Sequence, residues 1–159
     1  MLALGATATT CAKFVLAACV LVGLAASSAS AAGAQIGQVK TVSGHAFILR
    51  DAARNPAKVG DALLEKDVIE TAADGAIGIT FVDNTVFSAG PNSQVALEEF
   101  TFDSSNFKGT MTTDVNRGTV SVVSGDIARS SPGAMKVKTP TAILGVRGTV
   151  FAIQVGGDK

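Results

Sequence analysis

Hydrophobic and polar residues alternate in short runs along most of the chain, and the clearest run covers residues 77–82. There, isoleucine or phenylalanine alternates with glycine, threonine or valine, which is the period of two expected of a strand with one buried face. Asp83 and Asn84 follow directly, and another β-prone segment begins at Val86. Because Asp and Asn tolerate positive φ, these residues predict a tight hairpin.

Other short runs of β-prone residues are predicted as strands, and they cover residues 39–42, 46–49, 68–71, 95–102, 107–115, 119–123, 135–138 and 146–155. In the run that begins at Val95, we expect Val95, Leu97 and Glu99 to share one face. Turn or loop residues separate the runs, at positions 43–44, 51–58, 74–75, 90–93, 103–106, 116–118, 131–133 and 139–140.

This spacing of strands and turns predicts a single all-β domain of short antiparallel strands, built as a sandwich, a barrel or a short β-solenoid. The best helix candidate runs from Ala57 to Lys66, although Gly60 in its middle weakens it. The motif V-x-x-V-S-G occurs at residues 39–44 and again at 120–125. It indicates either two similar strand–turn units or an internal duplication. Most phenylalanines are expected in the core, namely Phe81, Phe87, Phe100, Phe102, Phe107 and Phe151.

The first 31 residues have the composition of a secretory signal peptide. Lys13 precedes an apolar run from Phe14 to Ala26, and Ala29-Ser30-Ala31 supplies an A-x-A cleavage signal. The run is shorter than the roughly 20 residues of a transmembrane helix. We therefore expect a cleaved signal helix at residues 1–31, a folded domain at 36–155, and a periplasmic or secreted location.

Two alternatives to this cleavage are open. Leu16 to Cys19 resembles a lipobox, although the apolar run continues beyond the cysteine, and an uncleaved anchor is the other alternative. Contact with a membrane is expected only in these two cases. Cleavage after Ala31 removes both cysteines and one of the 13 basic residues but none of the 13 acidic ones, which leaves a net charge of −1. This balance argues against nucleic acid as a partner, because nucleic-acid binding needs clustered positive charge.

The residues for catalysis are few. His45 is the one histidine, and the chain has no Trp or Tyr. One histidine cannot supply a zinc site, and no serine has the context of a nucleophile elbow. Five aspartates near turns are interpreted as surface carboxylates rather than as a metal site, namely Asp61, Asp67, Asp74, Asp83 and Asp126. We therefore predict no enzymatic activity, no cofactor and no metal.

Arg147 is the most informative charged residue, because it lies between Gly145 and Gly148. Glycines permit close approach of the backbone, so the guanidinium is expected to pin the last strand or, alternatively, to bind an anion. The candidate site is therefore a structural or anion-binding motif made of Thr139, Pro140, Arg147, Gly148 and Thr149. Candidate turn motifs are Gly60-Asp61 and Asp83-Asn84.

Three stretches of the chain carry recognisable motifs. They are residues 59–75, with G-D and D-x-I-x-T elements; residues 77–97, with a strand, a D-N turn and G-P-N-S; and residues 137–149, with V-K-T-P-T-A and G-V-R-G-T. Together these stretches resemble the FecR-like periplasmic domain. Asn84 stands where the family often has glycine, which fits the same turn. The resemblance covers about residues 36 to 155.

The resemblance implies an all-β domain outside the cytoplasm, without a catalytic or ligand-binding residue. In the best-known relatives this domain belongs to a membrane-spanning regulator that senses a loaded iron transporter. We find no sigma-binding helices and no second membrane-spanning segment, so we do not expect that mechanism to apply unchanged. Our leading hypothesis is a non-enzymatic periplasmic domain that binds a protein or cell-envelope partner. The alternatives are an accessory in FecR-type iron or envelope-stress signal transduction, and a binder of a small ligand or sugar. The oligomeric state is open.

Overall fold

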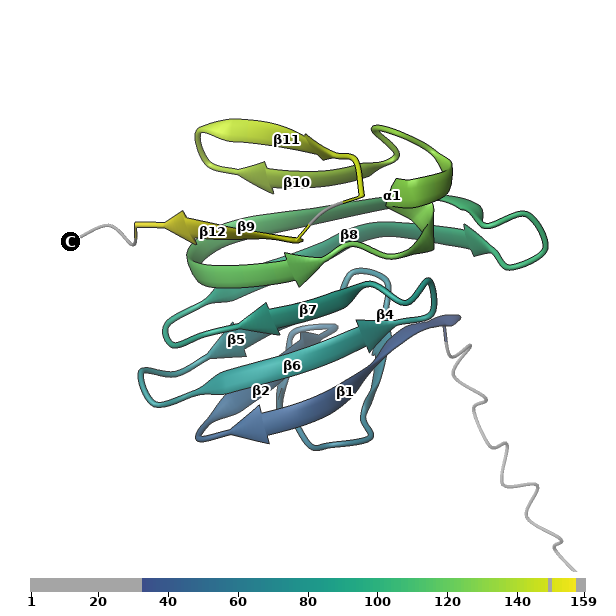
Figure 1. Ribbon diagram of the computed structural model, residues 1–159. Helices are drawn as coiled ribbons and strands as arrows, with labels where there is room; N and C mark the ends of the chain where they lie inside the picture. Colours follow the sequence, from purple (N-terminus) through teal and green to yellow (C-terminus); the bar gives the residue numbers. More distant parts are fainter. Residues whose placement is uncertain (1–32, 149, 157–159) are drawn as a thin grey trace, which may run out of the picture. The chain divides into compact units, whose positions relative to one another are not determined.

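The computed structural model describes residues 33–148 and 150–156, and this part of the chain is almost entirely β-structure (Figure 1). The predicted signal segment, the lipobox and Thr149 lie outside the described residues. The strands are β1 (Gln35–Ser43), β2 (Ala46–Arg50), β3 (Ala53–Pro56), β4 (Ala62–Leu64), β5 (Val68–Thr71), β6 (Ala76–Phe81), β7 (Val86–Ala89), β8 (Gln94–Asp103), β9 (Lys108–Val123), β10 (Met135–Thr139), β11 (Ala142–Val146) and β12 (Val150–Val155). A short helix, α1 (Asp126–Ser130), lies between β9 and β10.

The strands form a curled sheet whose two halves share the long strand β9. The half that we call sheet A has the order β4-β1-β6-β7-β9-β12, and the half that we call sheet B has the order β3-β2-β5-β8-β9-β10-β11. Within the described residues all pairs are antiparallel except β9 and β10, which run parallel. A parallel pair needs a crossover connection, and α1 provides it here. The predicted all-β class is confirmed, with this one parallel pair added.

β9 is the corner of the fold, where the chain passes from sheet B to sheet A. Its first part pairs with β8 and β10, and its last part pairs with β7 and β12. The predicted turn at residues 116–118 is wrong, because the strand continues through it. The turn-forming residues instead produce a bulge opposite Gln94 and a bend at Gly118, whose φ is +94°.

The inner faces of the two sheets form one hydrophobic core. The alternation in β6 is confirmed, because Ile77, Ile79 and Phe81 are buried and their neighbours are not. The hairpin after β6 is also confirmed, and Asn84 takes positive φ there. The expected core includes Phe87 and Phe100 and, partly buried, Phe102 and Phe151. Phe107 was wrongly placed in it, since this side chain is exposed in the β8–β9 turn.

Glu99 does not share the inward face of β8. A bulge between Leu97 and Glu99 shifts the phase of the strand by one residue. Phe100 therefore points inward and stacks on Phe81, with ring centroids 5.7 Å apart. A bulge cannot be predicted from a period of two. Its one extra residue moves all later side chains of the strand to the opposite face.

The predicted helix from Ala57 to Lys66 is wrong, since this segment holds turns and the short strand β4. Its backbone pairs with neighbouring strands: the Gly60 N–H donates to the Val39 carbonyl at 2.9 Å. Gly60 and Lys66 both take positive φ, which a right-handed helix excludes. One predicted break also contains a strand, because β3 lies in the polar segment 51–58. The predicted break at residues 139–140 is confirmed, but the strand β11, which begins at Ala142, was not predicted.

Candidate protein-binding edge

The hairpin of β10 and β11 forms one end of sheet B. Two residues connect the strands, and the Thr139 hydroxyl bridges the turn by hydrogen bonds to the backbone of Ala142. In the part of the chain that the structure describes, β11 pairs with β10 alone, so its outer edge has no neighbouring strand. Ile143 is 68% exposed on the outer face, and Leu144, which pairs with the buried Val137, is 41% exposed on the inner face.

The strand β12 forms the corresponding end of sheet A. It pairs with β9 alone among the described strands. Phe151 and Ile153 face Val122 and Val120, which are completely buried, and both side chains pack against the core while staying half-buried. The inner faces of β11 and β12 are thus apolar, yet no described residue closes the space between them.

A groove of about 700 Å³ occupies this space. Leu144 and Ile153 contribute apolar walls, and Arg117 lies among its polar lining. The remaining lining residues come from β9, from the β10–β11 turn and from β12, and they are Asn116, Thr139, Pro140, Thr141, Ala152, Gln154, Val155 and Gly156. The groove thus lies between two free strand edges, and its lining is partly apolar and partly polar.

The edges of β11 and β12 lack the features that normally keep free strands from pairing. Natural edge strands carry charge or proline, or are very short. β3 carries Arg54 and Pro56, and β4 is only three residues long. By contrast β11 reads Ala-Ile-Leu-Gly-Val and β12 reads Val-Phe-Ala-Ile-Gln-Val, without charge or proline. These two edges can therefore accept another strand.

The predicted motif is only partly brought together. Thr139 and Pro140 line the groove, whereas Arg147 and Gly148 lie at the opposite end of β11. The two ends are about 13 Å apart along the strand, at 3.3 Å per residue. Arg147 is exposed and makes no ion pair with another described residue. Gly148 lies beside Arg129 of α1. The pinning and anion-binding roles of Arg147 remain predictions.

A family model described as FecR protein matches residues 67–159. The chain belongs to the FecR family. The match begins within the first of the three stretches that carry the resemblance, and it includes β5 to β12 and the groove between β11 and β12. No curated protein and no solved structure matches the chain. Within the described parts of this FecR-family chain, no helix has the length and apolarity needed to cross a membrane.

The predicted turn residues of the FecR domain have structural contacts. The Asp61 carboxylate accepts a hydrogen bond from the Lys58 N–H at 2.8 Å, next to Gly60 with φ of +97°. The interpretation of Asp67 and Asp83 as surface carboxylates is wrong, because both are buried. Asp83 accepts hydrogen bonds from the N–H and hydroxyl of Thr85. The neighbouring Asn84 donates to Asp126 at the start of α1. These contacts hold turns in place, and the groove does not include them.

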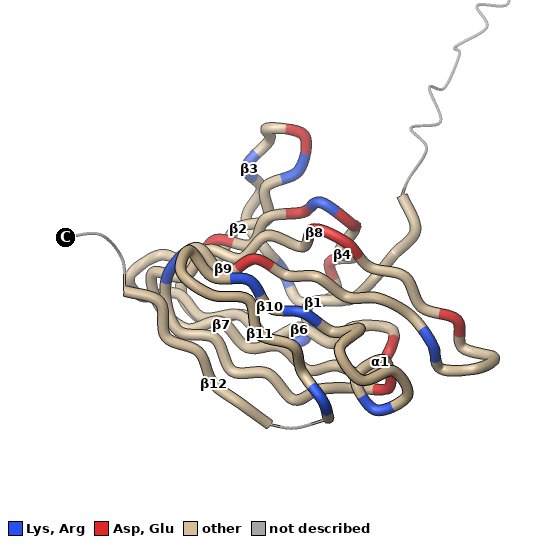
Figure 2. The backbone as a smooth tube through the Cα atoms, turned by 90° about the horizontal axis from the view of Figure 1, so that it is seen from above, with Lys and Arg blue, Asp and Glu red and all other residues tan. Residues whose placement is uncertain are grey.

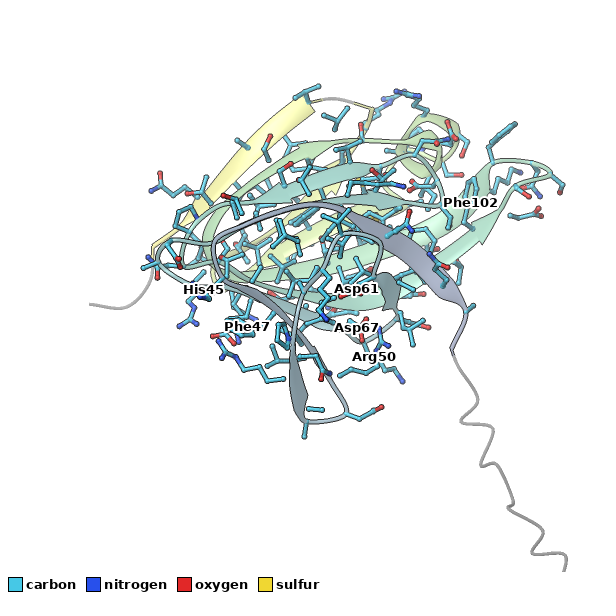
Figure 3. All side chains as sticks on the ribbon, turned by 90° about the horizontal axis from the view of Figure 1, so that it is seen from below. His45, Phe47, Arg50, Asp61, Asp67 and Phe102 are labelled. Atoms are coloured by element: carbon cyan, nitrogen blue, oxygen red, sulfur yellow. The ribbon has the colours of Figure 1, made fainter. Side chains whose placement is uncertain are left out.

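The sequence gives no indication of the ion pair between Arg50, the last residue of β2, and the buried Asp67 (Figure 3). Arg50 donates to both carboxylate oxygens of Asp67, at 2.7 and 2.6 Å, and Asp67 is only 1% exposed. Asp67 also accepts from the Leu64 N–H at 2.8 Å. Asp67 stands between turn residues and β5, and nothing in its local sequence identifies Arg50 as its partner. Among residues 33–148 and 150–156, no three His, Cys, Asp or Glu side chains gather as a metal-binding group.

The His45–Asp74 pair predicts an acid-dependent change in stability. His45 Nδ1 lies 2.7 Å from Asp74 Oδ2, and this hydrogen bond lowers the pKa of the Asp74 carboxyl below its ordinary value. A lowered pKa means that the carboxylate stabilises the fold above the unfolded-state pKa, and that this contribution is lost as the pH falls through the folded-state pKa. We expect the Tm to fall below about pH 4, and to fall less in the Asp74→Asn variant.

Thermal unfolding at a series of pH values measures this effect. Asp103→Asn is the parallel variant, because hydrogen bonds from Ser105 lower the pKa of the Asp103 carboxyl at the opposite end of the molecule. Each variant should reduce the fall in Tm at acid pH by the part that its own carboxylate causes. An Asp74→Asn protein with the same acid sensitivity as the original chain would contradict the assignment to this pair.

Proposed function

We propose that this FecR-family chain is an exported, non-enzymatic domain that binds a protein partner of the cell envelope by adding a strand of that partner to the edge of β11. The observation that carries the proposal is the unprotected edge of β11 beside the groove of about 700 Å³. Export itself is inferred from the signal sequence at residues 1–31. Mass spectrometry of the N-terminus of the processed protein tests that inference and the domain limits of 36–155.

Strand addition suits this edge for two reasons. The free N–H and C=O groups of β11 offer main-chain hydrogen bonds that do not depend on the partner's sequence. The groove then accepts every second side chain of the added strand, since successive side chains point to opposite faces. Leu144 and Ile153 make the groove selective for apolar side chains at those positions. We therefore expect a partner segment that is extended, largely uncharged and apolar at alternate positions.

Site-specific photo-crosslinking in the intact source cell tests this proposal. A photoreactive phenylalanine analogue at Ile143 is expected to give a discrete crosslinked protein, because this side chain stands at the free edge. The same analogue at Lys136, which is exposed on the paired strand β10, is the matched control and should give none. Sequencing of the crosslinked peptide should place it in a β-prone, uncharged segment.

A charged variant separates binding from folding. Gly145→Lys puts a charge on the edge strand, where space for a side chain is open. It should abolish the crosslink at Ile143, because charge on an edge strand blocks pairing. The Tm should fall only slightly, through repulsion from the exposed Lys136, which pairs with residue 145. A crosslink that persists in Gly145→Lys, or a crosslinked segment that is helical or highly charged, would rule out strand addition at β11.

A second candidate function is an accessory role in FecR-type iron or envelope-stress signal transduction. Membership of the FecR family favours it. It predicts that deletion of the gene alters transcription in response to iron or envelope stress, and that Gly145→Lys reproduces the deletion. Unchanged transcription in the deletion strain would exclude this role without affecting the proposed strand-binding edge.

A further inference from the structure

The outer face of sheet A carries a row of exposed valines that crosses three strands. Val86 of β7 pairs with Val123 of β9, and Val123 pairs with Val150 of β12. Their exposed fractions are 39%, 39% and 67%. Cross-strand partners lie about 5 Å apart, so the three side chains form one continuous apolar stripe. We call these three residues the valine ridge.

A row of small residues runs beside the valine ridge, two positions away along each strand. Gly78 pairs with Ser88, Ser88 with Ser121, and Ser121 with Ala152. Residues two apart in a strand point to the same face, so this row lies parallel to the ridge. A hollow of about 430 Å³ follows it and is lined in part by Gly78, Ser88 and Ser121. We call Gly78, Ser88, Ser121 and Ala152 the small-residue trough.

The strands that carry the ridge and the trough hold no charge on this face, and the charges nearest to it lie at its borders, on Arg129 of α1 beside Val123 and Val150 and on Lys40 of β1. β6, β7 and β12 contain no charged residue, and Figure 2 shows the backbone of β12 without blue or red segments. Sheet B has the opposite character, with ion pairs such as Lys138–Glu98 and Arg117–Glu70 at its surface. A partner for sheet A therefore needs an uncharged surface with apolar side chains.

We propose that a second copy of this chain packs face to face on sheet A, with the valine ridge of each copy in the small-residue trough of the other. A twofold axis parallel to the two rows, midway between them, places the ridge of one copy directly over the trough of its partner. Val123 of one copy then lies over Ser121 of the other, and Val86 over Ser88. Such self-complementarity is what a twofold interface requires.

Charge and size support a second copy as the occupant. The strands of the ridge and the trough bring no like charges together, and the twofold axis carries Arg129 of the second copy to the trough side of the first, away from the first copy's own Arg129. Stacked sheets pack about 10 Å apart, a distance that interdigitated valines and small residues can fill. The five strands β1, β6, β7, β9 and β12 at about 4.8 Å spacing make a face of roughly 20 Å by 20 Å. Two such faces bury about 800 Å² in total, which is below the size of a stable interface and fits a weak one. We therefore expect a reversible dimer whose population depends on concentration.

Sedimentation of the processed protein over about 10 µM to about 1 mM should show a monomer–dimer equilibrium. Val123→Lys is expected to shift it to monomer throughout this range, because the lysine would be placed over Ser121 without a partner. Ile143→Lys is the matched control, since it replaces another exposed apolar residue, on β11, and should leave the dimer intact. Far-UV circular dichroism and the Tm establish that both variants fold.

The pairing of ridge with trough is tested by mixing two variants. Val123→Glu and Ser121→Lys should each be monomeric alone, and an equimolar mixture should recover the dimer, because the twofold axis brings the two charges together. A wild-type protein that stays monomeric at about 1 mM, equal effects of Val123→Lys and Ile143→Lys, or a failure of the mixture to recover would each overturn the proposal. The edge of β11 is not involved, so these outcomes leave the proposed strand-binding function unaffected.

Discussion

Replacement of Gly118 by alanine is expected to be among the most destabilising single substitutions in the domain. An alanine Cβ at this position would lie 2.2 Å from the Ser93 hydroxyl oxygen and 2.4 Å from the Ser93 Cα. The overlap with Cα cannot be relieved by rotating a side chain, so β9 must move away from the β7–β8 connection. The steric overlap adds to the cost of placing alanine at a φ of +94°. We therefore expect the free energy of unfolding to fall by about 3 kcal/mol or more.

Gly60→Ala is the matched control for this prediction. Gly60 has nearly the same φ, +97°, but a Cβ there would have no atom within 4 Å. It should cost only about 1 kcal/mol, which is the price of the left-handed conformation alone. Urea unfolding of both variants measures the difference. If the two variants lose the same stability, the close approach of Ser93 to the corner of β9 plays no part.

Gly118 also shows why the local sequence does not predict this part of the fold. The residues Asn116-Arg117-Gly118 have turn chemistry, and a turn is the correct local inference from them. The structure uses the same chemistry for a bulge and a bend inside one strand, because β8, β10, β7 and β12 all pair with β9 around this point. Which of the two outcomes occurs depends on strands far away in the sequence.

Elements with a one-sided pattern were predicted correctly for a physical reason. β6 alternates because one face is buried by sheet B and the other is open, and the Asp83–Asn84 turn has its own local conformational preference. β11 was missed because Pro140 breaks the chain just before it and the strand is exposed on both faces, so it shows no alternation. The short strand β4 was mistaken for a helix because three residues cannot display a period.

The candidate binding surfaces were invisible to sequence reasoning for a related reason. Whether a strand has a free edge depends on which strands pair in the folded sheet. The ridge and the trough likewise depend on the register between β6, β7, β9 and β12. Valines and serines in a β-rich sequence are ordinary residues until the register aligns them in rows. The edge of β11 and the outer face of sheet A are made of different residues, so occupation of one does not require the other to be free.

Loss of the Asp67 carboxylate is expected to destabilise the domain by about 3 kcal/mol, because it leaves the Leu64 N–H without its partner and leaves Arg50 with the Ala62 carbonyl alone. This value lies at the lower end for broken buried pairs because Arg50 is 38% exposed and keeps some hydration. Asp67→Ala should lower the Tm by roughly 10 °C in a domain of this size. Asp61→Ala is the control, since it removes one hydrogen bond at a turn and should cost about 1 kcal/mol.

A double-mutant cycle separates the ion pair from the burial of Asp67. Arg50→Met keeps the aliphatic stem but removes the charge, and Asp67→Asn keeps the volume. If the bidentate contact stabilises the link between β2 and the start of β5, the double variant should be more stable than the sum of the single losses by about 1 kcal/mol or more. Additive losses would mean that Asp67 acts through the Leu64 N–H alone. In that case Asp67, which belongs to the first stretch that resembles the FecR family, would be needed for the turn before β5 and not for the contact with β2.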